Sequence, residues 1–317
     1  MREYLLVLLI AAAVTYLSSA LCRRLAFRVG ALAKVRDRDV HTVEMPYFGG
    51  VAMLAGVGAA ILLSWQLPFL GSQPTVLQDS RAVLVSAAVI GLVGVLDDVF
   101  DLPPLAKFSG QVLAAGIAVA LGVKMLWIPL PDQIVSLNAS TSVAIAGACL
   151  GFLPHNFFPA RMFMGDSGSM LLGLLLATST ISLTGQIDNS QLDSTSGFLP
   201  TILPLVLPLA ILALPFLDLT LAFVRRTYAG KWWFLPDKQH LHHRLLERGH
   251  SQRRAVLLMY VWSALVSFGV IVLGLVRGDR QWTVVAVVAV LALVLLGVTL
   301  GRPVRNGSPP RPGESLS

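Results

Sequence analysis

Long, uninterrupted apolar runs separated by short polar segments restrict this chain to very few folds. A helix needs about 20 mostly apolar residues to cross the hydrocarbon of a bilayer, because lipid leaves no other partner for its backbone polar groups. The runs here are continuous rather than alternating, which argues against a transmembrane β-barrel. Hydrophobic residues make up 55% of the 317 residues and charged residues only 13%. We therefore expect an all-α, polytopic transmembrane protein.

Scanning for such runs predicts a bundle of about nine spans. Their approximate ranges are Tyr4–Leu21, Gly49–Leu67, Ala82–Leu96, Gly110–Val123, Val143–Phe157, Ser169–Leu183, Leu199–Val224, Ala255–Val276 and Trp282–Leu300. We expect residues 1–301 to form a single transmembrane domain. The tail 302–317 is rich in proline, glycine and serine, so we expect it to be disordered.

Basic residues are concentrated in alternate connecting segments, which predicts the orientation of the chain. The basic segments include 23–38, 225–254 and 302–311, together with Lys107 and Arg161, whereas the other segments hold only Arg2, Arg81, Lys124, Arg277 and Arg280. Lysine and arginine are retained on the cytoplasmic side. We therefore expect a multi-pass protein of the cytoplasmic membrane, with its N-terminus outside and its C-terminus cytoplasmic. This topology explains the net charge of +7 without a nucleic-acid partner.

Two adjacent carboxylates, Asp97 and Asp98, follow the third run at its cytoplasmic end. Neighbouring like charges are costly unless a cation or a proton compensates them, so the pair is typical of a divalent metal site or a general base. Simple solvation at the membrane interface is the alternative. Lys107 is the nearest cation and could hold a phosphate or merely anchor the topology.

A second polar block joins the fifth and sixth runs. It contains Asn156, Arg161 and Asp166, with Gly165 and Gly168 on either side of the aspartate. Glycines beside an aspartate allow the backbone to approach a phosphate-bound Mg²⁺ closely. Asp166 could instead be only an N-cap of the next helix.

A histidine-rich motif lies in the basic loop after the seventh run. It consists of His240, His242, His243 and Arg244. A zinc site is conceivable, but the spacing lacks a second pair of ligands. Imidazole and guanidinium groups that bind an anionic phosphate are the better interpretation.

Taken together, the three motifs resemble the polyprenyl-phosphate N-acetylhexosamine-1-phosphate transferase family, of the glycosyltransferase family 4 type. The similarity is greatest to its bacterial branch, which uses N-acetylglucosamine-1-phosphate. The matching pieces are Asp97-Asp98 with Lys107, the block from Pro154 to Gly168, and His240 to Arg244. Residues 36–41 and Gly49-Gly50 also look like the first cytoplasmic loop of that family.

The resemblance implies a Mg²⁺-dependent reaction, with Mn²⁺ as an alternative cation, on the cytoplasmic face. N-acetylglucosamine-1-phosphate would pass from UDP-N-acetylglucosamine to undecaprenyl or decaprenyl phosphate, releasing UMP and starting the synthesis of a lipid-linked cell-envelope glycan. By family analogy Asp166 binds the metal, and Asp97 and Asp98 activate or position the lipid phosphate. Lys107, Asn156, His240, His242, His243 and Arg244 would bind the substrates. A homodimer remains an open alternative to a monomer.

One part of the family pattern is missing. The family carries an Asn-x-x-Asp-Gly-x-Asp-Gly-type motif before the block that contains Asp166, whereas this chain contains no Asp-Gly pair. The segment Ser136–Cys149 contains no carboxylate, which resembles the loss of one span down and one span up. A family member that binds a UDP-sugar or lipid phosphate without turnover is therefore an alternative. A membrane transporter is another, with Asp218 as the charged residue nearest the middle of a span.

Overall fold

The computed structural model describes two compact units, which we treat separately. The first lies within Met1–Pro208 and the second within Leu209–Ser317. The described residues are 1–33, 43–123 and 139–184 in the first unit, and 209–210, 212–228, 230, 245–246, 249–276 and 280–300 in the second. The predicted tail 302–317 lies outside them, and the single domain over 1–301 stays a prediction.

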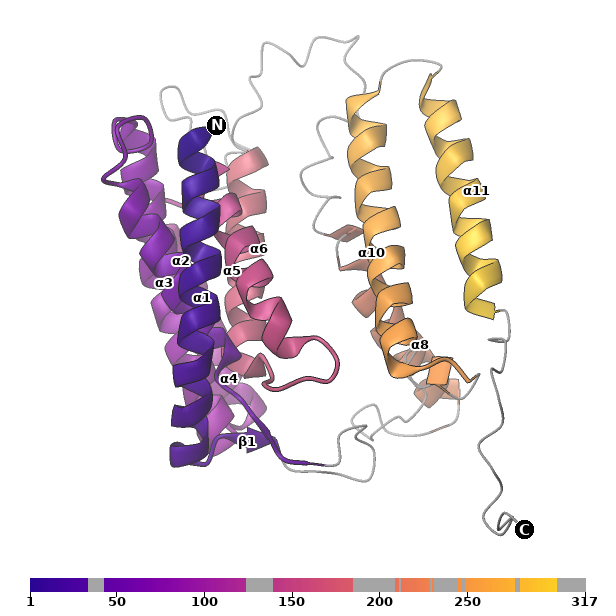
Figure 1. Cartoon of the computed structure of the whole chain (residues 1–317), viewed down its shortest axis with the longest axis horizontal. Helices are drawn as coiled ribbons and strands as arrows, with labels where there is room; N and C mark the ends of the chain where they lie inside the picture. Colours follow the sequence, from indigo (N-terminus) through magenta and orange to yellow (C-terminus); the bar gives the residue numbers. More distant parts are fainter. Residues whose placement is uncertain are drawn as a thin grey trace, which may run out of the picture. The chain divides into compact units, whose positions relative to one another are not determined.

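The first unit is a bundle of helices with one short antiparallel strand pair (Figure 1). Its helices are α1 Arg2–Val29, α2 Gly49–Ser64, α3 Pro74–Phe100, α4 Pro104–Ala120, α5 Ala139–Asn156 and α6 Gly165–Thr184. The strands β1 Leu32–Ala33 and β2 Met45–Pro46 pair with each other. Helix α2 packs between α1, α5 and α6, while α3 packs on α6 and α4.

Backbone hydrogen bonds show that the helices of this unit run alternately up and down. The Gly49 and Gly50 N–H groups at the start of α2 donate to the carbonyls of Phe163 and Met164, just before α6. The end of α1 joins the same end of the bundle, because the Tyr47 N–H donates to the Ala31 carbonyl. Contacts described below bring the ends of α3 and α5 and the start of α4 to this place. The polar motifs therefore share one end of the bundle.

Small residues and aliphatic side chains fill the core of the first unit. Met53, Val57 and Ile61 of α2 are almost fully buried against Leu171 and Leu175 of α6. The outer surface is apolar as well, and Leu17, Leu21 and Leu92 are each more than 60% exposed. A bundle that is apolar both inside and outside is suited to a bilayer.

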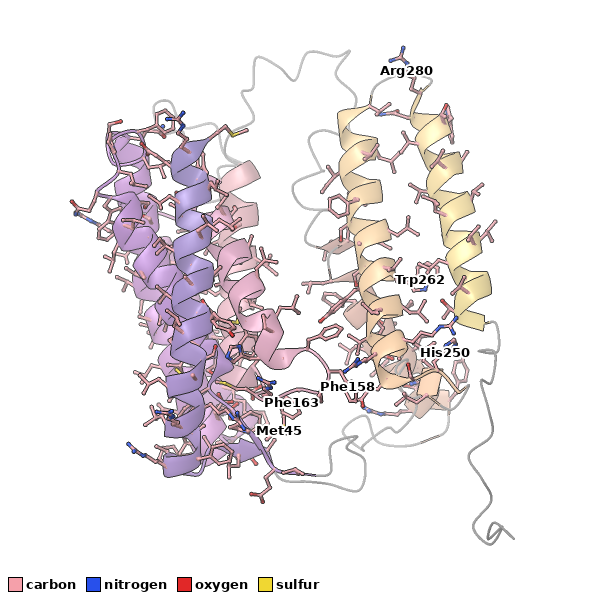
Figure 2. The ribbon with its side chains drawn as sticks, in the orientation of Figure 1. Met45, Phe158, Phe163, His250, Trp262 and Arg280 are labelled. Carbon is pink, nitrogen blue, oxygen red and sulfur yellow. The ribbon has the colours of Figure 1, made fainter. Side chains whose placement is uncertain are left out.

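The second unit contains α8 Ala213–Tyr228, α10 Gln252–Leu275 and α11 Arg280–Leu300. Helices α10 and α11 pack together, and the Trp262 indole N–H donates to the Thr299 hydroxyl over 3.1 Å (Figure 2). The His250 Nε2 lies 3.2 Å from the Thr299 carbonyl oxygen. These contacts join the end of α11 to the middle of α10 and to the segment just before α10.

Four described helical segments are long and apolar enough to cross a membrane, namely Arg2–Val29, Ser80–Phe100, Gln252–Leu273 and Arg280–Thr299. The apolar helices Gly49–Ser64 and Pro104–Ala120 are shorter. Each predicted span contains or overlaps a described helix, although residues 199–208 of the seventh lie outside the described residues. The predicted all-α membrane protein is confirmed at this level, and the number of nine spans stays a prediction.

Candidate functional site

Three charged side chains from three helices meet at the polar end of the first unit. The Lys107 ammonium at the start of α4 lies 2.7 Å from Asp97 Oδ2 near the end of α3. The same nitrogen lies 3.2 Å from Asp166 Oδ2 at the start of α6. The Asp97 side chain is only 2% exposed, that of Lys107 is 27% exposed and that of Asp166 is 47% exposed. The cluster is therefore anchored inside the bundle and open on the Asp166 side.

Asp97 also closes the end of its own helix. Its Oδ1 accepts a hydrogen bond of 2.9 Å from the Leu102 N–H, and its carbonyl accepts one from the Asp101 N–H. One carboxylate oxygen thus stabilises the turn after α3, and the other faces Lys107. The Leu102 N–H and the Lys107 ammonium together fix the orientation of the Asp97 carboxylate.

Asp98, the next residue, faces α6 instead of Lys107. Its Oδ1 accepts a 2.6 Å hydrogen bond from the Asp166 N–H, and its Oδ2 accepts bonds from the Ser167 hydroxyl at 2.7 Å and the Ser167 N–H at 3.4 Å. Free N–H groups at a helix start favour a negative charge. Asp98 therefore caps α6 from another helix and holds Asp166 in place.

Gly165 allows this cap to form. Its φ of +74° lies in the left-handed region, and a Cβ at this position would collide with the Asp98 carboxylate. Helix α3 also approaches α6 closely at Gly94, where a Cβ would meet the Ser167 backbone. Both glycines thus bring the carboxylates of α3 and α6 together.

The loop between α5 and α6 is held to the neighbouring elements by hydrogen bonds. The Asn156 side-chain amide donates to the Met162 carbonyl over 3.2 Å. The Phe163 N–H donates to the Pro46 carbonyl of β2, and Figure 2 shows Phe163 beside Met45. Asn156, which we predicted to bind substrate, thus orders the loop that leads to Asp166.

Lys107 and Asp166 lie outside the four described segments that are long and apolar enough to cross a membrane, whereas Asp97 and Asp98 lie within Ser80–Phe100. A hydrogen bond with the Asp97 carboxyl, and secondarily one with Lys107, lowers the pKa of Asp166 although burial opposes them. Burial lowers the pKa of Lys107, but hydrogen bonds with Asp97 and Asp166 outweigh it and leave the pKa raised. At neutral pH the cluster therefore contains an ionised Asp166 and a charged Lys107.

The described residues fit a divalent cation only together with a ligand. They contain no group of three or more His, Cys, Asp or Glu side chains suited to a metal. Oxygens of Asp97 and Asp166 nevertheless face the single Lys107 ammonium. Mg²⁺ is commonly bound by one or two carboxylates plus substrate phosphates. The cluster meets that requirement if a diphosphate supplies the remaining oxygens.

The structure brings together four predicted residues, Asp97, Asp98, Lys107 and Asp166. His240, His242, His243 and Arg244 lie outside the described residues, so their predicted role is untested. Ser167 was not predicted, although it contacts Asp98 through both its hydroxyl and its N–H group. Its position directly after Asp166, in Gly-Asp-Ser-Gly, was the available signal.

Comparison with known proteins identifies the family. The model of glycosyl transferase family 4 matches residues 80–143 and 134–184, which include all four residues of this site. A decaprenyl-phosphate N-acetylglucosaminephosphotransferase of Mycobacterium tuberculosis is 39% identical over 332 residues, covering 85% of this chain and 82% of the relative. The chain belongs to glycosyl transferase family 4. The predicted resemblance is thereby confirmed.

Two further family members extend the similarity. The protein of the same name from Mycolicibacterium smegmatis is 36% identical over 371 residues, covering 97% of this chain and 91% of the relative. A probable undecaprenyl-phosphate N-acetylglucosaminyl 1-phosphate transferase of Bacillus subtilis is 29% identical, with 86% and 85% coverage. The similarity to family 4 therefore extends well beyond the two motif regions.

The family comparison also bears on the missing segment. The alignment with the Mycobacterium tuberculosis protein spans 332 residues, more than this chain contains, although it covers only 85% of the chain. The relative therefore contains internal residues that this chain lacks. The two pieces of the family match overlap over residues 134–143, which extend into the first residues of α5, in the region where the sequence predicts the loss.

Proposed function

We propose that this family 4 member transfers N-acetylglucosamine-1-phosphate from UDP-N-acetylglucosamine to a polyprenyl phosphate in the cytoplasmic membrane. The relatives carry names of such enzymes. The observation that supports the proposal most directly is the convergence of Asp97, Lys107 and Asp166 at one end of a membrane bundle. A lipid acceptor would reach this end from the bilayer and a nucleotide from the cytoplasm.

The reaction needs one bond formed and one broken. An oxygen of the lipid phosphate attacks the sugar-bearing β-phosphorus, and the bond from that phosphorus to the bridging oxygen breaks, releasing UMP. Such a transfer depends on in-line positioning and on neutralising charge more than on covalent catalysis. A cation is therefore needed wherever two phosphates approach each other.

The residues of the cluster divide this work. Asp166 and Asp97 would hold Mg²⁺ or Mn²⁺, which supplies positive charge to the diphosphate when bound. Lys107 supplies a fixed positive charge for the lipid phosphate. Asp97, whose Oδ1 accepts a hydrogen bond from the Leu102 N–H, keeps its Oδ2 directed towards Lys107. Asp98 positions Asp166 through the start of α6.

The missing segment favours a second candidate function, binding of the donor or the lipid phosphate without turnover. The Mycobacterium tuberculosis relative contains internal residues that this chain lacks, and the two pieces of the family match overlap over residues 134–143. The family motif that this chain lacks carries carboxylates. The site of this chain therefore has fewer negative groups to bind a cation than the sites that carry the motif. Binding requires only the charged groups that remain.

Both candidates are tested by one experiment on purified full-length protein. UMP release is measured with UDP-N-acetylglucosamine, polyprenyl phosphate and Mg²⁺, alongside calorimetric binding of the nucleotide. Release by the parent and by Asp101→Asn, but not by Asp166→Asn, supports the transferase. Nucleotide binding that Asp166→Asn weakens, without UMP release, supports the second candidate. Neither release nor binding would refute both.

A further inference from the structure

A cluster of basic groups lies outside the Asp97–Lys107–Asp166 site, where α1 passes the end of α5. It consists of Arg23 on α1, His155 at the end of α5 and Arg161 in the following loop. None of the three belongs to the Asp97–Lys107–Asp166 site. The cluster comes from three separate segments, so their proximity is a property of the fold.

Helices α1 and α5 run in the same direction and in register. A Cβ on Gly147 would meet the Leu8 carbonyl oxygen, and a Cβ on Gly151 would meet that of Ala12. One further turn along both helices brings His155 against Tyr16. The centroids of the two rings lie 4.8 Å apart, and the angle between the ring planes is 76°. This close packing fixes the position of the imidazole.

Arg23 follows Tyr16 by two helical turns and so lies on the same face of α1. The loop after α5 folds back on His155, whose carbonyl accepts hydrogen bonds from the Arg161 N–H at 2.8 Å and the Met162 N–H at 3.2 Å. The positive charges of both arginines act on the imidazole. Helix packing and backbone hydrogen bonds thus fix the backbone positions from which both arginines act on the imidazole, while the Arg23 guanidinium itself lies 5.9 Å from the centre of the Phe27 ring.

No carboxylate in the described part of the chain neutralises this cluster. The ion pairs there join Lys107 to Asp97 and Asp166, and neither Arg23 nor Arg161 takes part in one. The His155 Nδ1 is enclosed and has no hydrogen-bond partner. Like charges held together are unfavourable without a counter-ion, so the arrangement calls for an anion that accepts hydrogen bonds.

The surroundings indicate where that anion comes from. Leu17, Leu21 and Leu25 of α1 are exposed over the two turns around Arg23, as expected for a surface facing acyl chains. Guanidinium groups bind phosphate oxygens in a bidentate manner. Anionic lipid headgroups attract basic groups at the edge of a span.

We propose that Arg23, Arg161 and the Nδ1 of His155 form a binding site for a phosphate group, carried by an anionic phospholipid. The proposal is independent of the transferase activity, because it uses none of the residues assigned to it. The diphosphate of a soluble sugar nucleotide has the same chemistry and is the other source of phosphate to be tested.

The test compares two double variants of the full chain with equal net charge. Arg23→Gln with Arg161→Gln removes both arginines of the site, whereas Arg24→Gln with Arg28→Gln removes two exposed arginines of the same helix end. Native mass spectrometry measures binding of phosphatidylglycerol and of phosphatidylcholine, and calorimetry measures binding of UDP-N-acetylglucosamine. We expect phosphatidylglycerol affinity to fall by about tenfold per arginine in the first variant only.

A third variant separates the built site from general attraction. His155→Phe keeps an aromatic ring against Tyr16 but removes Nδ1, and should weaken phosphatidylglycerol binding while the charge of both arginines is retained. Loss of nucleotide affinity alone in the Arg23/Arg161 variant would keep the phosphate site but assign it to the soluble ligand. Equal losses in both double variants, or no loss of either ligand, would overturn the proposal.

Discussion

Replacing Asp98 by asparagine tests whether this residue holds α6 in place. The carboxylate accepts three hydrogen bonds, from the Asp166 N–H, the Ser167 N–H and the Ser167 hydroxyl. Asparagine keeps one acceptor oxygen of similar shape but turns an amide NH₂ towards the donors. The substitution therefore removes negative charge and acceptor capacity at the start of α6 with little change in volume.

The expected cost follows from these contacts. A hydrogen bond to a charged group contributes about 1.5–3 kcal/mol, and a negative charge near a helix start about 0.3–2 kcal/mol. Because asparagine retains one acceptor, we expect Asp98→Asn to lower the free energy of unfolding by about 3 kcal/mol. For a unit of this size that corresponds to a fall of about 6–12 °C in melting temperature.

Thermal unfolding of purified protein in detergent measures this effect. Asp101→Asn is the matched control, since Asp101 is exposed at the end of the same helix and has a φ of +51°, which asparagine tolerates. Asp101→Asn should melt within about 2 °C of the parent protein. A melting temperature of Asp98→Asn equal to that of the control would refute the assignment of Asp98 as the cap of α6.

Three further outcomes follow from the same site. Gly165→Ala should lower the free energy of unfolding by at least about 2 kcal/mol, because its φ is +74° and the new Cβ meets the Asp98 carboxylate. Lys107→Gln should lower it by about 2 kcal/mol by leaving Asp97 without its cation, and less when Asp97→Asn is also present. The Asp97 carboxyl is the main cause of the lowered pKa of Asp166. The parent should therefore melt at a higher temperature than Asp166→Asn, with the largest difference above about pH 4. This difference should disappear as the pH falls through the pKa of Asp166.

Each of these outcomes has a control. Gly116→Ala, at a helical position with no atom near the new Cβ, should leave the protein as stable as before or slightly more so. A Lys107→Gln effect that is unchanged in the Asp97→Asn background would show that the ion pair is not its cause. The pH prediction has a clear sign. A carboxylate with a lowered folded pKa stabilises the fold at higher pH, so a difference that grows on acidification would contradict it.

The apolar runs predicted the helices because continuous hydrophobicity over this length leaves the backbone few alternatives in lipid. The same patterns could not separate the roles of two neighbouring aspartates. Successive residues of a helix point about 100° apart, so Asp97 faces Lys107 of α4 while Asp98 faces the start of α6. Which direction belongs to which residue depends on how α3 packs between α4 and α6, and that packing is set by contacts between helices such as the close approach of Gly94 to the Ser167 backbone.

The basic cluster of Arg23, His155 and Arg161 was not predicted for a related reason. Its members lie far apart in the sequence, and each alone is typical of a residue that flanks a membrane span. Only the register between α1 and α5, set by Gly147 and Gly151, brings Tyr16 against His155. A stripe of small residues predicts close packing of two helices but does not name the partner helix.

The break in the family match can be reconciled with a bundle that still assembles its site. Helix α4 starts at the polar end, where Lys107 meets Asp97, and α5 finishes at that end, where Asn156 contacts the loop before Asp166. Helix α4 therefore ends, and α5 begins, at the opposite end of the unit. Loss of an even number of spans there preserves the direction of every following helix. Loss of an odd number would have carried Asp166 to the far end, away from Asp98.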